Sequence, residues 1–309
     1  MSAPVKISRS RWCALAAYLA ALGLLFSGTL RELGACARKD LYSHLPLIPA
    51  ISAWLIYRRR GQVFSLRQPA AGLSVALLLG GAAAGVAALA GARSAADPAA
   101  FLSLKVFSLV TLLLAGVTWI FGATVWRTAA FPLGFLYFLL PLPARWHEAA
   151  VTLLQRMTAP AAQALFLLTG TPVFREGQLL CVPGLNLQVA AECSGIHSTL
   201  VLAITALLAG HLLLRRWWSR ALLAAVTIPL GVLRNALRIV AIALLTIHVD
   251  PAIIHGPLHR RGGPVFFVLS LALLLAMLLG LRKLEQRAVE RRAAAPSGAG
   301  PAAGQGGGV

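Results

Sequence analysis

The feature that most constrains the fold is a series of apolar runs, most of them long enough to cross a bilayer. A membrane-spanning helix needs about 17–25 predominantly apolar residues. The 309-residue chain is 59% hydrophobic and only 12% charged, and its mean hydropathy is +0.79. These values are typical of integral membrane proteins. Six runs have crossing length and two shorter ones are expected to cross as well: 12–30, 70–91, 99–121, 195–214, 221–248 and 264–281, then 44–57 and 128–142. We therefore predict an all-α polytopic membrane protein with about eight transmembrane helices.

One further segment, 149–170, carries Gln155, Arg156 and Gln163 among apolar residues and contains Pro160. This mixture favours a helix lying at the membrane interface, although whether the segment spans the bilayer stays open. If it crossed, every later loop would change sides, and the basic loop at 215–220 would then face outward.

Charge sets the orientation. The net charge is +19, but the basic residues fall in short clusters between apolar runs rather than in one patch, which argues against nucleic-acid binding. In the eight-span arrangement the inner segments hold 16 basic residues against two acids, and the outer segments hold 10 against seven. The positive-inside rule then places both termini in the cytoplasm. We expect a multi-pass protein of the bacterial inner (plasma) membrane.

The outer segment 171–191 has strand character. Residues 173–178 and 185–189 flank Pro183-Gly184, a turn signal, so we predict a small outward-facing β-hairpin. Residues 1–290 are expected to form one membrane domain, and residues 291–309, rich in Ala, Gly and Pro, a disordered cytoplasmic tail.

The second arm of this hairpin leads directly into Cys193, at the start of a long apolar run. A thiol in the first turn of a helix meets unpaired N–H groups and the helix dipole, which favour the nucleophilic thiolate. Glu192 opposes deprotonation, so a reactive Cys193 needs a cation nearby. The alternative is a small packing cysteine. The four cysteines show no CxxC spacing, and neither a metal nor a cofactor is expected. Whether Cys36 and Cys181 pair is left open.

Arg238 and His259 are the two candidates for that cation. Arg238 lies inside an apolar run together with Arg234, and an arginine there costs on the order of 2.5–3.5 kcal/mol and therefore rarely lacks a role. Counted from Ala221 at the inner surface, Arg238 lies about 25 Å along the helix, in the same outer leaflet as Cys193. Its guanidinium suits a developing oxyanion. The competing interpretation is structural, with these arginines bonded to helix carbonyls.

His259 precedes the last apolar run, and its imidazole titrates near neutrality, so it is a candidate proton carrier. His197 competes for this role because it lies one helical turn from Cys193. Arg260 and Arg261 are candidates for binding an acidic substrate group or are ordinary interfacial arginines. HExxH, GxSxG and DHHC motifs do not occur in the sequence.

The motifs together resemble the exosortase/archaeosortase family of integral membrane cysteine transpeptidases. The matching pieces keep their order over residues 40–285: Tyr42-Ser43-His44, Phe131-Pro132-Leu133 with Pro141-Leu142-Pro143, Arg175-Glu176-Gly177, Cys193-Ser194-Gly195-Ile196, Asn235-Ala236-Leu237-Arg238-Ile239, and His259 followed by Gly263 and Phe267. His197 departs from the pattern, because the family more often has arginine there.

The resemblance implies a catalytic set of Cys193, Arg238 and His259. Our own expectation is that four further residues contact the substrate: Arg234, His197, Arg260 and Arg261. It also implies exported protein substrates with a C-terminal sorting tail: a Pro-Glu-Pro-like signature, one transmembrane helix and a basic cluster, as found in bacteria that make exopolysaccharide. An amine acceptor then resolves the thioester on Cys193, whereas water in its place makes the enzyme a cysteine peptidase. The alternative is a transporter or structural membrane component in which Arg234 and Arg238 line a polar pathway.

Overall fold

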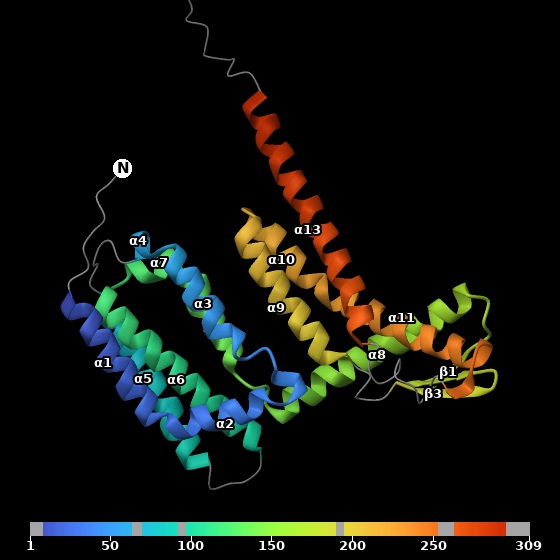
Figure 1. Cartoon of the computed structure of the whole chain (residues 1–309), viewed down its shortest axis with the longest axis horizontal. Coiled ribbons are helices and arrows are strands. Elements are labelled where there is room, and N and C mark those ends of the chain that lie inside the picture. Colours follow the sequence, from blue (N-terminus) through green and yellow to red (C-terminus); the bar gives the residue numbers. More distant parts are fainter. Residues whose placement is uncertain (1–8, 64–69, 92–96, 190–194, 253–262, 295–309) are drawn as a thin grey trace, which may run out of the picture. The chain divides into compact units, whose positions relative to one another are not determined.

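A computed structural model describes residues 9–63, 70–91, 97–189, 195–252 and 263–294. The chain divides into two compact units, Met1–Leu154 and Gln155–Val309. Figure 1 labels the main helices and strands of the two units.

The first unit is helical throughout its described part. Its core is one cluster of side chains centred on Val106, Val110 and Leu114 of α6, each of which is at most 1% exposed. Its elements are α1 (Arg9–Leu25), α2 (Ser27–Ala37), η1 (Asp40–Tyr42), α3 (Leu47–Arg58), α4 (Arg60–Val63), α5 (Ala71–Gly91), α6 (Pro98–Phe121), α7 (Thr124–Phe135), η3 (Leu136–Leu139) and the start of α8 (Ala144–Leu168).

Helix α6 is defined at both ends by local chemistry. The carboxylate of Asp97 accepts hydrogen bonds from the backbone N–H groups of Ala99 and Ala100, and Pro98 occupies the first turn, where a missing N–H costs nothing. The helix ends at Gly122, whose φ of 82° suits glycine. Helix α5 packs along it, with the Ser108 hydroxyl donating to the Gly81 carbonyl at 2.7 Å.

The described part of the second unit combines a small sheet with the C-terminal part of α8 and four further helices. Its elements are the rest of α8, β1 (Phe174–Glu176), β2 (Leu179–Val182), β3 (Leu185–Gln188), α9 (Ile196–Leu213), α10 (Trp217–Ala225), α11 (Thr227–His248) and α13 (Gly263–Ala294). Helix α13 thus runs past residue 290, where the membrane domain was predicted to end.

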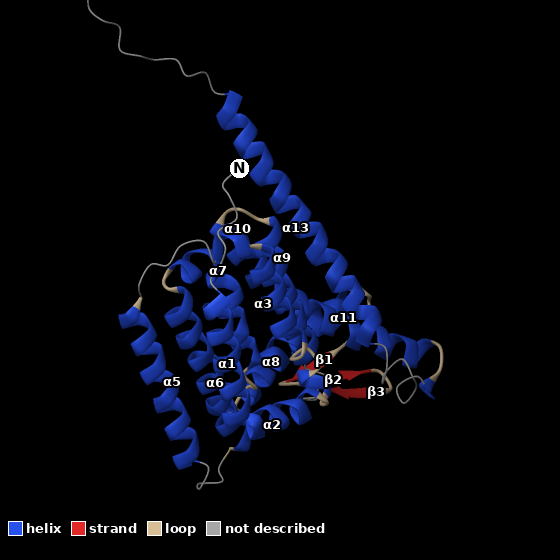
Figure 2. Cartoon of the chain, turned by 60° about the vertical axis from the view of Figure 1, so that its left-hand side comes forward, coloured by secondary structure: helices blue, strands red, loops and turns tan. Residues whose placement is uncertain are grey.

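The predicted two-arm hairpin is replaced by a three-stranded antiparallel sheet in the order β1-β2-β3 (Figure 2). The turn at Pro183-Gly184 is present, but it joins β3 to β2, with Val182 opposite Leu185. The residues predicted as the first arm pair with β2 across an additional turn, with Phe174 opposite Cys181. The intervening Leu179–Val182 strand, which is mostly buried, lacks the alternation that the prediction relied on.

Five described helices are long and apolar enough to cross a membrane, or seven if each of two bent helix pairs counts as one span. The predicted eight are not reproduced among the described residues. Helix α3 has 12 residues, about 18 Å, and is shorter than the roughly 30 Å hydrocarbon core. The first apolar run bends by 74° between α1 and α2.

The second bent pair includes the predicted interfacial segment. Helix α8 reaches the required hydropathy only together with α7 and η3, from which it is bent by 96°. Within α7, Pro132 cannot donate to the carbonyl of Thr128, and the Arg59 guanidinium donates to that carbonyl instead, at 3.2 Å. This contact lies beside Ala129, where the backbone of α7 leaves helical geometry (φ −126°, ψ 20°), and not at the 96° bend.

Candidate functional site

The candidate site is built where the start of α9 meets the middle of α11. Helix α9 begins at Ile196, three residues after Cys193, rather than at the cysteine as the sequence suggested. Its N-cap is Gly195, with φ 68° and ψ 19°, a left-handed conformation that L-residues with a side chain rarely adopt. The glycine in the Cys-Ser-Gly sequence is thus required by the backbone.

The carbonyl of Gly195 is the most heavily bonded group in this region. It accepts hydrogen bonds from the backbone N–H and the hydroxyl of Thr199, both at 2.9 Å, and from the hydroxyl of Ser198 at 3.3 Å. The fourth donor is Nη2 of Arg234 on α11, at 3.1 Å. The same nitrogen lies 3.5 Å from the Thr199 hydroxyl. The guanidinium therefore fixes the first turn of α9 to α11.

Small residues make this close approach possible. A Cβ added at Gly195 would lie 2.4 Å from Nη2 of Arg234, and one at Gly231 would lie 2.4 Å from the Thr199 hydroxyl oxygen. Gly231 thus faces Thr199, and Arg234 faces Gly195, so the two helices run antiparallel at this contact. Asn235, 1% exposed, lies beside them.

Arg234 is a buried cation. It is 5% exposed, and among the described residues no carboxylate lies within ion-pair distance of it. Its Nη1 atom is buried and has no hydrogen-bond partner in the described part of the chain. Such a donor is costly to leave unpaired, so this nitrogen is a candidate for contacting a ligand, while the Nη2 bond to the Gly195 carbonyl is of the structural kind.

Arg238 lies one turn further along α11 and is partly buried. Residues four apart share a helix face, so Arg238 is on the side of Arg234. Because α9 and α11 are antiparallel here, Arg238 extends about 6 Å beyond the first turn of α9. His197 is in that first turn and is partly buried.

The chain segment that contains Cys193 is held at both of its described ends. On one side, Val189 is 1% exposed, its N–H donates to Gln178, and its carbonyl accepts a hydrogen bond from the Gln155 side chain at 2.6 Å. On the other side, Gly195 is held by Arg234. Between these anchors lie residues 190–194, outside the described residues, and with them Glu192 and Cys193.

The structure therefore brings together part of the predicted site. Arg234, Arg238 and His197 lie at or beside the start of α9, whereas His259, Arg260 and Arg261 lie outside the described residues. The other three cysteines, Cys13, Cys36 and Cys181, are free thiols. Gln155 and Thr199 were not predicted as site residues, although the sequence had shown Gln155 to be a polar residue in an apolar segment. Among the described residues, no cluster of His, Cys, Asp and Glu could hold a metal ion.

Comparison with known proteins agrees with the sequence resemblance. Residues 36–276 match a family model described as a transmembrane exosortase. No curated protein and no solved structure matches the chain. The match covers well over half of the sequence and includes both helices of the candidate site.

Proposed function

The chain belongs to the transmembrane exosortase family, and from this premise we propose that it is a membrane-embedded cysteine transpeptidase or protease. It cleaves the C-terminal sorting tails of exported proteins through a thioester on Cys193. The observation that carries the proposal is the contact between Arg234 and the Gly195 carbonyl. Through this contact the buried Arg234 guanidinium is fixed to Gly195, which is two positions after the proposed nucleophile Cys193 in the sequence. A thiolate next to the negative charge of Glu192 needs such a cation.

In the proposed reaction, the Cys193 thiolate attacks a backbone carbonyl of the sorting signature and forms a tetrahedral intermediate. His259 protonates the leaving amine, which leaves a thioester on Cys193. An amine acceptor then attacks the thioester, giving transpeptidation, whereas attack by water gives proteolysis. His197 is the alternative proton carrier.

The two arginines are proposed to divide the work. Arg234 is already bonded to Gly195 and Thr199, so it positions the start of α9 and adds positive charge near the thiolate. Arg238, which lies beyond the start of α9, is proposed to stabilise the oxyanion. Arg260 and Arg261 are proposed to attract the acidic residue of the sorting signature.

The proposed location is the bacterial inner membrane, with cytoplasmic termini and the site on the periplasmic side. Its substrates there are membrane-anchored proteins whose Pro-Glu-Pro-like signature emerges from the bilayer. In the alternative function, a transporter or structural membrane component, Arg234 and Arg238 would line a polar pathway. Burial at 5% and a direct bond to a helix carbonyl favour a fixed role for Arg234 instead.

The test is co-expression with an exported protein that carries a sorting tail. Cys193→Ala should leave the full-length substrate in the membrane fraction, whereas Cys13→Ala, at an exposed cysteine, should process it normally. Normal processing by Cys193→Ala would overturn the proposal. The mass of the released product separates the two reactions, since transpeptidation adds the acceptor amine and proteolysis leaves a free carboxylate.

A further inference from the structure

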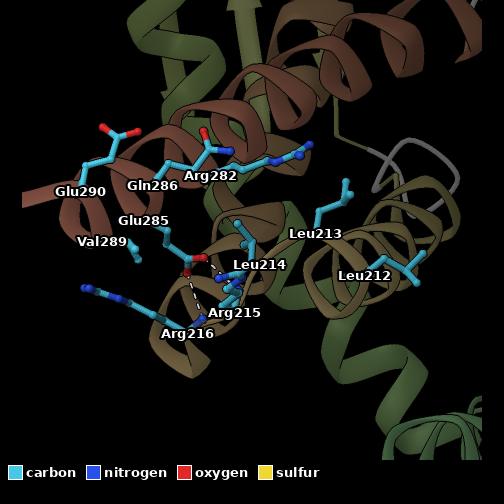
Figure 3. A pocket seen from close by; sticks show the side chains of 10 residues that line it. All are labelled: Leu212, Leu213, Leu214, Arg215, Arg216, Arg282, Glu285, Gln286, Val289 and Glu290. Carbon is cyan, nitrogen blue, oxygen red and sulfur yellow. Dashed lines mark hydrogen bonds between the residues drawn. The ribbon is translucent and has the colours of Figure 1, made fainter. Parts of the chain in front are cut away.

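A cavity of about 440 Å³ with a mixed charged and apolar lining lies at the C-terminal end of α9, where α9, α10 and α13 meet (Figure 3). Its charged lining includes Arg215 and Arg216 of the α9–α10 connection and Arg282 of α13. Leu212, Leu213 and Val289 add exposed apolar surface. The 18 residues of α9 place this cavity about 27 Å along the helix from Gly195, so it is separate from the candidate catalytic site.

The floor of the cavity is fixed by Glu285. This residue is 6% exposed, and its carboxylate accepts hydrogen bonds from the backbone N–H groups of Arg215 at 2.8 Å and Arg216 at 3.0 Å. Beneath it, Leu214, Leu223 and Leu281 belong to the apolar cluster that joins the three helices. The carboxylate is therefore occupied by the backbone, and the cavity rests on a packed base.

Glu285 offsets part of the positive charge of the lining, since the Arg216 charge stabilises its carboxylate. Among the described residues, Arg215, Arg216 and Arg282 form no ion pair, and the Arg216 and Arg282 side chains extend away from Glu285 (Figure 3). Arg216 lies over the Trp218 ring, 6.0 Å from its centre. The exposed Glu290 on the rim is the other carboxylate of the lining, so the arginines keep an excess of positive charge.

The cavity also lies where a lipid headgroup would be. One apolar helix of crossing length, α9, ends at the cavity, the helical segment Trp217–His248 begins after its lining residue Arg216, and α13 passes it. Trp217, the next residue after Arg216, is 79% exposed. Tryptophan and arginine at helix ends are typical of the membrane–water interface. A ligand with an anionic head and apolar chains matches both the arginines and the exposed leucines, whereas a soluble anion would use the arginines alone.

We propose that this cavity binds the phosphate of an anionic phospholipid, with Arg215, Arg216 and Arg282 around the headgroup and Leu212 and Leu213 against the acyl chains. Basic pockets between membrane helices on the cytoplasmic side bind such headgroups. A phospholipid headgroup and free inorganic phosphate both present a phosphate anion to the arginines, and the phospholipid is the proposed ligand. The proposal does not depend on the peptidase activity.

The experiment is native mass spectrometry of the full-length protein, released from detergent and titrated with three probes. These are dioctanoyl phosphatidylglycerol, dioctanoyl phosphatidylcholine and inorganic phosphate. At about 1 kcal/mol, or about fivefold, for each basic residue, and with Glu290 opposing by a similar factor, the cavity should favour the anionic lipid over the neutral one by roughly 25-fold. The triple variant Arg215→Gln/Arg216→Gln/Arg282→Gln should lose this preference.

The matched control is Lys283→Gln/Arg287→Gln/Arg291→Gln, which removes the same charge from exposed positions of α13 that do not line the cavity. It should keep the preference, and Glu290→Gln should strengthen it about fivefold. Equal loss in both triple variants would overturn the proposal, as would an unchanged pocket variant. Binding of inorganic phosphate as tight as that of the lipid would overturn the lipid as source. If the triple variant does not fold, the single variant Arg282→Gln, at an exposed position, is tested instead. It should weaken lipid binding about fivefold, and unchanged lipid binding would refute the site.

Discussion

Replacing Gly195 by alanine tests how firmly Arg234 holds the start of α9. The backbone at φ 68° costs an alanine about 1–2 kcal/mol. The new methyl group would lie 2.4 Å from Nη2 of Arg234. The side-chain end can move away, but it then gives up its bond to the Gly195 carbonyl, and a hydrogen bond to a charged group contributes about 1.5–3 kcal/mol. The total expected loss of unfolding free energy is about 3–5 kcal/mol.

Gly184→Ala separates the two contributions. Gly184 also has a positive φ, 78°, but a Cβ there would meet nothing within 4 Å, so this variant should lose only about 1–2 kcal/mol. Both free energies are measured by SDS-induced unfolding in mixed micelles. Equal destabilisation by the two substitutions would refute a tightly held Arg234. A second check is Gly195→Ala in an Arg234→Ala background, where the additional loss should disappear.

Three other substitutions test separate parts of the structure. Gly231→Ala should destabilise the protein by about 1–3 kcal/mol, since its methyl group would overlap the short Thr199 side chain. The control is Gly280→Ala, which has open space around it and should be neutral or stabilising. Both are measured by the same mixed-micelle assay. Glu285→Gln should lower the unfolding free energy by about 1–3 kcal/mol, because the Glu285 carboxylate accepts hydrogen bonds from two backbone N–H groups. Glu290→Gln, at an exposed position, should change the unfolding free energy by less than about 0.5 kcal/mol. Similar values for the two variants would contradict the role given to Glu285. Gln155→Leu should slow substrate cleavage by roughly tenfold, since it frees the Val189 carbonyl at one end of the Cys193 segment, and an unchanged rate would show that this anchor is dispensable.

Much of the architecture could be predicted from composition and local chemistry. Apolar length indicated the long helices α5, α6, α9 and α13, and the Pro183-Gly184 pair indicated a turn that is present. The bend of 74° after α1 was missed, although Ser27-Gly28, directly after Phe26, is the kind of Gly/Ser pair at which helices kink. The turn between β1 and β2 was missed because Leu179–Val182 is an almost continuous apolar strand.

The candidate site illustrates a different limit. From the sequence, Arg234 and Arg238 were expected inside one apolar run, with the oxyanion role assigned to Arg238. Which arginine contacts the start of α9 depends on how α9 and α11 align, and that alignment is set by the Gly231–Thr199 contact. Similarly, Gln155 looked like a residue of an interfacial helix, but its side chain bonds to the carbonyl of Val189. Such pairings between distant segments have no local signature.

The most direct test of the account is the reactivity of Cys193 in intact cells. Cys13, Cys36 and Cys181 are replaced by alanine, so that Cys193 is the single thiol of the four in the sequence. A membrane-impermeant maleimide is then applied from outside at neutral pH. We predict rapid labelling in intact cells that becomes at least about tenfold slower in Arg234→Gln, because the fixed cation favours the thiolate. Labelling that occurs only in inverted vesicles, or at the same rate with and without Arg234, would contradict the account.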